Sequence, residues 1–419
     1  MKTHYQILII GAGTAGIMTA AQLKKKDSSL DIALLDPATD HYYQPAWTLV
    51  GAGAYDKKKT IKPMASLIPP GVTWIQEAVT GFDAEHQAIT TTQTGTLTYD
   101  YLVVCPGLVN DYSLIEGLAE AVEQGVVCSN YIDPEYTWKQ LQAFQGGIAI
   151  FTQPSTPIKC GGAPQKIMYL ACDYFRKKGL DKKTKVYFPM PGSVIFGVKQ
   201  IADTLLKVVD RYQIDFMPLH NPIRIDAAKK MAYFKPTNAQ DNHCFVTSDD
   251  QQTQVLADGV VAMPFDFLHL APPQTAPKFV QTSNLVNAAG CLDVNHHSLQ
   301  HNKYKNIFGL GDVAGLPTAK TGAAIRKQVP VVVDNLMRLL QNQEASNTDY
   351  NGYSSCPLVT GYGKMVLAEF NYKNEFIPDP KLKQMLVFSS HKEHWRLWML
   401  KKHLLPYLYW SKMMKGEQV

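Results

Sequence analysis

The segment YQILIIGAGTAGIMTAAQLKKK, residues 5–26, determines the first part of the fold. In it an apolar strand runs into Gly11, Gly13 and Gly16, and a helix follows directly. Gly11 permits a tight turn, Gly13 lets the backbone approach a pyrophosphate, and Gly16 lets the helix pack on the strand. Asp36 closes the next strand, IALLD, where an acid accepts a hydrogen bond from a ribose hydroxyl. This order predicts a dinucleotide site, since a turn without a ligand would not need Asp36.

A second segment, NIFGLGDVAGLPTAKTGAAIRKQ, returns to the same domain far downstream. Gly311 and Asp312 form a turn after a strand, and simple NAD enzymes have no use for such a segment. Asp312 can bind a ribityl chain, and a helix beginning near Thr318 to Gly322, with Thr321 as a further cofactor-binding candidate, can direct its positive end at the flavin N1/O2 edge. Lys320 would add to that positive potential. The pattern favours FAD over NAD; a surface aspartate at a turn and a solvated lysine remain the alternative.

The chain has 419 residues, too many for one core, and we predict an α/β fold with two Rossmann-like, doubly wound domains. The FAD-binding domain is expected to be discontinuous. The predicted limits are residues 1–112 and 285–345 for the FAD-binding domain, 113–284 for a second Rossmann-like domain without a nicotinamide loop, and 346–419 for a C-terminal region. In the second domain we expect strands at residues 146–152 and 184–190 with a helix over 164–179 between them.

Cys160 lies in IAIFTQPSTPIKCGGAPQK, where a second glycine-rich nucleotide loop would normally follow a strand. It precedes the predicted helix, with Lys159 beside it and Lys166 one turn into the helix. A helix N-terminus and nearby lysines lower a thiol pKa to about 3.5–7.5, so we expect a thiolate. Cys356, in SSCPLV, is followed by Pro357 and is expected on a turn. Two buried structural cysteines remain the alternative.

The seven cysteines show no CxxC or Cys/His spacing, so no metal site is expected. We interpret Cys105, Cys172, Cys244 and Cys291 as core or incidental residues. Cys128, in VVCSNY, is less certain because its setting could reach a cleft.

The tail HKEHWRLWMLKKHLLPYLYWSKMMKG, residues 391–416, is basic and aromatic. Residues 391–419 hold six Lys or Arg against two acids, so most of the formal net charge of +5 lies there. No uninterrupted apolar run reaches transmembrane length. The tail therefore predicts helices that lie in a membrane interface, and an anionic surface rather than nucleic acid as its partner. A helix docked on the protein's own core is the alternative.

Taken together, five segments resemble the sulfide:quinone oxidoreductase family, in particular its mitochondrial-type branch. They are GAGTAGI, HYYQPAWTLVGAG, KCGGAPQK, GDVAGLPTAKTGAA and SSCPLVTGYGKMVLAEFNYK, spread over nearly the whole chain. The resemblance implies that Cys160 and Cys356 form a redox pair beside FAD. Cys356 would receive the sulfide sulfur as a persulfide, and Cys160 would be the thiolate that faces the flavin. The better-known bacterial branch uses a third cysteine, which we do not assign to Cys128.

The family further implies a ubiquinone or menaquinone acceptor, monotopic membrane attachment and a homo-oligomer. Because the first strand begins near residue 5, we expect no leader and a bacterial inner membrane. In the implied reaction, sulfide opens the Cys160/Cys356 bridge, a thiolate adds to the flavin C4a, and two electrons pass through FAD to the quinone. A small sulfane acceptor would take the sulfur. The alternatives are a type II NADH:quinone oxidoreductase and a non-catalytic flavin/thiol redox sensor.

Overall fold

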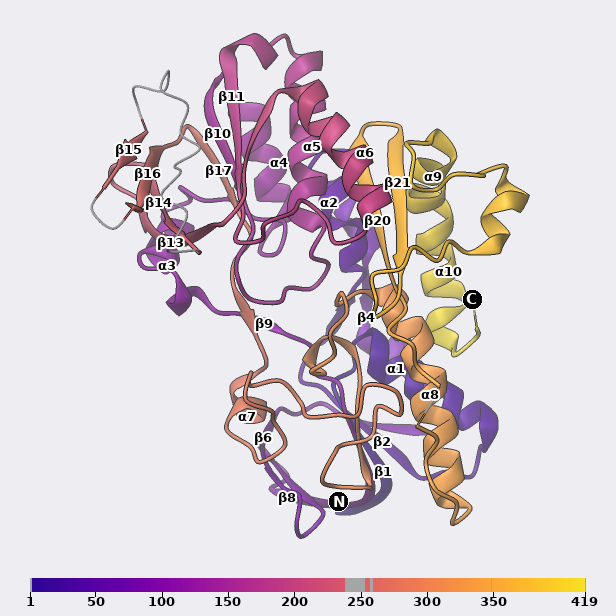
Figure 1. The fold of residues 1–419 in the computed structure, drawn as a ribbon. Coiled ribbons are helices and arrows are strands. Elements are labelled where there is room, and N and C mark those ends of the chain that lie inside the picture. The colour runs from indigo at the N-terminus through magenta and orange to yellow at the C-terminus, as the bar shows by residue number, and fades with distance from the viewer. Residues whose placement is uncertain (1, 238–252, 257–258, 348, 419) are drawn as a thin grey trace.

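Two parallel sheets organise the chain, one in the lower and one in the upper half of Figure 1. The structure is a computed structural model and describes residues 2–237, 253–256, 259–347 and 349–418. The predicted α/β fold with Rossmann-like parallel sheets is confirmed. The chain passes between the halves through two short antiparallel strands, β9 (Val109–Asn110) and β18 (Gln274–Thr275). The domain limits given above remain predictions.

The lower sheet carries the first glycine segment. Its strand order is β5-β2-β1-β8-β7-β6, and β19 pairs with β8 on a separate branch. The strands β1, β2, β5, β8 and β19 pair in parallel, and β6 and β7 add an antiparallel extension. Helices α1 and α8 pack together beside this sheet (Figure 1). The bounds are β1 (His4–Ile10), α1 (Thr14–Lys26), β2 (Ile32–Leu35), β5 (Val72–Ile75), β6 (Val79–Asp83), β7 (Ala88–Thr91), β8 (Thr96–Val104), β19 (Ile307–Gly309) and α8 (Gly322–Leu340).

The upper sheet is wholly parallel, in the order β12-β11-β10-β17. The predicted strands and the helix between them are present as β10, β11 and α5. A four-stranded antiparallel sheet, β13-β14-β16-β15, lies beside it (Figure 1). The bounds are α3 (Leu118–Glu123), α4 (Pro134–Ala143), β10 (Gly147–Thr152), α5 (Ala163–Lys177), β11 (Thr184–Pro189), α6 (Lys199–Tyr212), β12 (Ile214–Met217), β13 (His220–Asp226), β14 (Met231–Pro236), β15 (Gln254–Val255), β16 (Val261–Pro264) and β17 (Phe267–Leu270). The short helix α7 (Lys278–Gln281) lies beside β6 in the lower half (Figure 1). Shorter elements near the amino terminus are β3 (Asp40–Tyr42), α2 (Trp47–Val50) and β4 (Ile61–Pro63).

The C-terminal region opens with a hairpin of β20 (Ser354–Gly361) and β21 (Lys364–Phe370), which packs against α5. Cys356 therefore lies in a strand, and the turn expected from Pro357 is wrong. Proline is compatible with a strand that lacks a neighbour on one side, and β20 pairs only with β21. The hairpin carries Cys356 to the amino-terminal end of α5.

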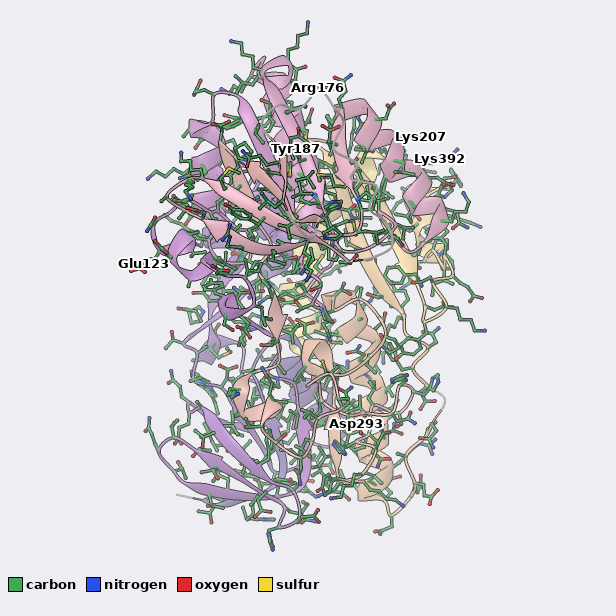
Figure 2. The ribbon with its side chains drawn as sticks, turned by 60° about the vertical axis from the view of Figure 1, so that its left-hand side comes forward. Glu123, Arg176, Tyr187, Lys207, Asp293 and Lys392 are labelled. Atoms are coloured by element: carbon green, nitrogen blue, oxygen red, sulfur yellow. The ribbon has the colours of Figure 1, made fainter. Side chains whose placement is uncertain are left out.

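The tail continues as α9 (Trp395–Met399), a π-helical turn (Leu400–Leu404) and α10 (Leu405–Ser411). Its first half packs with the upper core through Leu397 and Trp398, and its second half packs with the lower core through Tyr409 and Met413. Figure 2 shows Lys392 on the same flank as Lys207 of α6, near the ion pair between Arg211 and Glu393. Among the described residues, no helix combines the length and apolarity needed to cross a membrane.

Candidate active site

The glycine turn after β1 has the geometry of a phosphate cradle. Gly11 adopts a φ of +99°, and a Cβ there would lie 2.5 Å from the Cys105 carbonyl oxygen. A Cβ on Gly16 would lie 1.9 Å from the Gly11 carbonyl oxygen, so the helix could not pack this closely with a larger residue. Gly13, in contrast, has no atom within 4 Å of its Cβ position. Because Gly13 caps α1 and has no side chain, it cannot satisfy the first amides of the helix, and such helix ends bind anions.

Asp36 lies directly after β2 and braces this turn. Its Oδ2 accepts from the Ala12 amide at 2.7 Å, and its Oδ1 accepts from the Ala38 amide at 2.9 Å. The carboxylate is thus held at the end of the strand beside the glycine turn, where the sequence predicted an acceptor for a ribose.

The second predicted flavin segment forms a small pocket, lined in part by Gly311, Asp312, Lys320 and Thr321. Lys320 is only 8% exposed, and its Nζ donates to the Asp312 and Ala314 carbonyl oxygens, so the solvated lysine of the alternative interpretation is excluded. Burial lowers the pKa of Lys320 and raises that of Asp312, while each charge opposes the shift of the other. Thr321 caps α8, since its Oγ1 accepts from the Ala324 amide at 3.1 Å.

Space is open beside several glycines at the turns where a dinucleotide would bind. Four glycines have no atom within 4 Å of their Cβ positions and follow parallel strands, namely Gly13 after β1, Gly107 after β8, Gly161 after β10 and Gly322 after β19. Ligands of open α/β sheets bind beyond the carboxyl ends of the strands. The helix ends, the carboxylates and the open backbone have the chemistry that the phosphates and hydroxyls of FAD require.

Cys160 and Cys356 meet although 196 positions separate them, and their Sγ atoms lie 4.0 Å apart. A direct disulfide needs about 2.05 Å, so the two sulfurs would have to approach by roughly 2 Å to form one. Gly162 makes the approach possible, because a Cβ there would lie 2.5 Å from the Cys356 sulfur. The sequence interpretation did not include Gly162, although its place directly before the helix in KCGGAPQK was the available signal.

Hydrogen bonds hold the Cys160 backbone in the left-handed region, with a φ of +55°. Its amide donates to the Lys320 carbonyl oxygen at 2.7 Å. Its own carbonyl oxygen accepts from the Ala163 amide at 2.7 Å and from the Tyr131 hydroxyl at 3.2 Å. A non-glycine residue in this region is strained and persists only where its surroundings impose it. Tyr131 was not predicted from the sequence, which gives no sign of its contact with Cys160.

Residues 319–321 contact both the turn that carries Cys160 and the strand β20 that carries Cys356. Besides the Lys320 carbonyl that binds Cys160, the Ala319 carbonyl accepts from the Ser354 hydroxyl at 3.0 Å. The hydroxyls of Ser354 and Thr321 lie 2.9 Å apart. One short segment at the start of α8 therefore sets the position of Cys160 and, through β20, of Cys356.

Two buried lysines give the cysteine pair a positive environment. Lys166 Nζ donates to Cys160 Sγ at 2.9 Å, and Lys401 Nζ, in the tail, donates to the Pro45 carbonyl oxygen at 3.0 Å. The hydrogen bond from Cys356 and the charges of both lysines hold the pKa of Cys160 well below its usual value. The same hydrogen bond, together with burial, raises the pKa of Cys356.

The pKa values of the two lysines shift in opposite directions. Burial opposes the charge of Lys166, but attraction to the two sulfurs outweighs it and raises the pKa. Burial and repulsion from Lys166 lower the pKa of Lys401 to about 7. Lys166 is predictable from its place one turn into the helix after Cys160, whereas Lys401 is not, because only the folded tail brings that residue to the pair.

Three of the other described cysteines belong to the hydrophobic core. Cys105, Cys128 and Cys172 are buried, and burial raises the pKa of each thiol. For Cys128 the pKa rises to about 12, and its Sγ lies 3.4 Å from the Leu268 carbonyl oxygen. Cys291 is partly exposed, and Cys244 lies outside the described residues.

A groove of about 740 Å³ lies between the tail and the turn that follows α2. Apolar, aromatic and basic side chains share its wall. The lining residues are Gly53, Ala54, Tyr55, Asp56, Lys59, Lys402, His403, Pro406, Tyr407, Trp410 and Ser411.

Comparison with known proteins agrees with this fold. The family described as pyridine nucleotide-disulphide oxidoreductase matches residues 5–143. The crystal structure of the sulfide:quinone oxidoreductase from Aquifex aeolicus superposes with a TM-score of 0.76 at 20% identity, covering all of this chain and 92% of that one. The molecule thus has the α/β fold of the pyridine nucleotide-disulphide oxidoreductases.

Relatives that match over nearly the whole chain identify the family within this fold class. The mitochondrial sulfide:quinone oxidoreductase of Mus musculus is 37% identical over 417 residues, covering 99% of this chain and 87% of the mouse protein. The mitochondrial sulfide:quinone oxidoreductase of Dictyostelium discoideum is 36% identical over 422 residues, covering 100% of this chain and 87% of the Dictyostelium protein. The chain belongs to the sulfide:quinone oxidoreductase family, as the resemblance in the sequence predicted. Because these relatives are mitochondrial proteins, they give no support to the expected bacterial membrane.

Proposed function

We propose that this protein oxidises sulfide to sulfane sulfur at Cys160 and Cys356 and passes two electrons through FAD to a membrane quinone. The observation that carries the proposal is the convergence of the two sulfurs, 4.0 Å apart, next to the flavin segment. The Lys320 carbonyl oxygen, 2.7 Å from the Cys160 amide nitrogen, links this pair directly to that segment.

The sulfur step follows from the asymmetry of the pair. Hydrosulfide attacks Cys356 of the oxidised bridge, the Cys160–Cys356 bond breaks, and the products are a Cys356 persulfide and a Cys160 thiolate. A thiol of low pKa leaves fastest in such exchange, and Cys160 is the member whose pKa is lowered. Lys166, at 2.9 Å, stabilises the departing thiolate. A small nucleophilic acceptor then takes the outer sulfur and leaves a Cys356 thiolate.

Reformation of the bridge releases two electrons. FAD, when bound, would accept this pair and pass it to the quinone. Gly11, Gly13 and Gly16 would hold the pyrophosphate, Asp36 the ribose, and Asp312 the ribityl chain. Lys320 and the amino-terminal end of α8, capped by Thr321, would place positive potential at the flavin ring.

The groove beside α10 suits the quinone. It is large enough for a quinone head group, and Tyr407 and Trp410 offer flat apolar contacts. Exposed apolar side chains of the C-terminal region, including Phe388 at 74% and Trp395 at 59%, lie among basic residues and would rest in the membrane interface. Monotopic attachment through this surface would let the quinone enter from the lipid.

Sulfide added to the purified flavoprotein with decylubiquinone tests the proposal. We expect loss of the quinone absorbance that depends on sulfide and on both cysteines. A protein that binds FAD but leaves it oxidised in excess sulfide contradicts the proposal and favours a redox sensor. Rapid bleaching of the flavin by NADH would instead favour the type II NADH:quinone oxidoreductase alternative.

A further inference from the structure

The tail makes a direct hydrogen-bonded connection to the glycine turn, although nearly the whole chain lies between them. The Tyr409 hydroxyl, on α10, lies 2.7 Å from Thr14 Oγ1 and 2.5 Å from His41 Nε2. His41 Nδ1 lies 3.2 Å from the Ala12 carbonyl oxygen. Ala12 and Thr14 flank Gly13, the glycine that faces open space. The network therefore holds the cradle from both sides of its most open position.

The direction of each hydrogen bond follows from the groups involved. A carbonyl oxygen only accepts, so the imidazole proton of His41 resides on Nδ1 and is donated to Ala12. His41 Nε2 then accepts from the Tyr409 hydroxyl, whose oxygen accepts from Thr14. Burial lowers the pKa of His41, which favours this neutral imidazole. Tyr409 thus serves as both donor and acceptor, and phenylalanine could replace neither role.

Packing around the network keeps α10 against the flavin domain. Tyr409 is 4% exposed, and its ring lies 4.6 Å from that of Tyr43 between centroids. Lys62 Nζ lies 4.8 Å from the Trp410 ring centroid. Farther on, the backbone of Gly416 meets α1 so closely that a Cβ would lie 2.9 Å from Ala21. The second half of the tail is therefore part of the flavin domain's own core.

We propose that Tyr409 and His41 are positioning residues for the phosphate-binding turn, so that the C-terminal helix forms part of the flavin site. The inference rests on the proposed binding of FAD. The same helix also lines the groove, through Tyr407 and Trp410. Displacement of α10 would consequently loosen the cradle as well as the groove, and intact docking of the tail becomes a condition for holding the flavin.

The affinity of the apoprotein for FAD tests this, measured by quenching of flavin fluorescence without any substrate. Tyr409→Phe keeps the ring and removes the hydroxyl, and we expect the Kd for FAD to rise about tenfold, the scale of one buried hydrogen bond. Thr14→Ala should give a similar rise, and Thr14→Ser should restore affinity. Tyr136→Phe is the matched control: its hydroxyl donates to the Gly125 carbonyl oxygen at 2.7 Å in the other domain, and the Kd should not change.

The outcomes separate positioning from general stability. If Tyr409→Phe lowers the melting temperature of the apoprotein but leaves the Kd for FAD unchanged, the proposal is overturned. Should Tyr409→Phe fold poorly, His41→Asn provides a second test, since its amide can still donate to Ala12 while the acceptor for Tyr409 is lost. An unchanged Kd in that variant also overturns the proposal. The proposed function is judged separately, because these titrations contain neither sulfide nor quinone.

Discussion

The turn after β1 and the turn after β10 are built alike and carry different chemistry. Each follows a parallel strand and leads into a helix that begins with small residues. At the first, the space beyond Gly13 is open. At the second, Cys356 and Leu358 of β20 cover Gly162, directly ahead of α5. What covers the start of the helix therefore decides whether the turn can receive a phosphate or presents a thiolate.

The largest effect expected from this comparison is loss of the thiol chemistry at the second turn. Cys160→Ser or Cys356→Ser should lower sulfide-dependent quinone reduction by at least about a thousandfold, because a hydroxyl cannot form the bridge. Steady-state assays with decylubiquinone measure this. Cys291→Ser is the control and should keep full activity. Full turnover in either active-site variant would eliminate the cysteine mechanism.

Two alanine substitutions probe the first turn in different ways. Gly13→Ala places a methyl group where no atom lies within 4 Å, so the protein should fold normally and bind FAD about a hundredfold more weakly. Gly16→Ala meets the Gly11 carbonyl oxygen at 1.9 Å and should lower the melting temperature instead. FAD titration and thermal unfolding separate these effects. Equal FAD affinity in Gly13→Ala and the unmodified protein would show that the open space is not the phosphate site.

Removal of the Lys166 charge at the second turn should change the pH dependence of the reactivity of the Cys160 thiol. The pKa of Cys160 is lowered in part by Lys166, so the thiolate persists to low pH and protonates only as pH falls through that lowered value. In Lys166→Met the pKa should rise by about 1–3 units, the usual effect of losing an adjacent opposite charge. The rate of alkylation by iodoacetamide as a function of pH measures this. Lys177→Met, on the exposed side of α5, is the control, and an unshifted profile for Lys166→Met would contradict the role of Lys166.

The smallest effect concerns the segment that joins the two turns. Ser354→Ala removes the hydroxyl that donates to Ala319 and contacts Thr321, at a cost of about 1 kcal/mol in the free energy of unfolding. We expect the turnover number to fall about threefold as Cys356 moves more freely relative to Cys160. The reduction potential of the cysteine pair gives a second readout. If stability falls while the potential and the turnover number stay the same, Ser354 serves stability alone.

Local patterns were sufficient for the fold class and for the first turn, because both depend on neighbouring residues. Gly11, Gly13 and Gly16 act through backbone conformation and contact within one strand-turn-helix unit. Local rules misplaced Cys356, since Pro357 suggests a turn and only the pairing of β20 with a single neighbour reveals an edge strand. The position of the tail could not be predicted from its aromatic and basic pattern, because some of its side chains pack in the two hydrophobic cores and others are exposed.

Local sequence patterns were enough for the two parallel sheets, the glycine turn after β1 and the family, and they pointed to the two cysteines of interest. Tertiary structure alone decided the 4.0 Å approach of their sulfurs, the contribution of Lys401 and Tyr131, and the contact of Tyr409 with Thr14. The two sets of features differ in the sequence separation of the residues that interact. Backbone geometry and helix periodicity are encoded within about a turn of chain, whereas contacts between residues hundreds of positions apart exist only after every intervening element has packed.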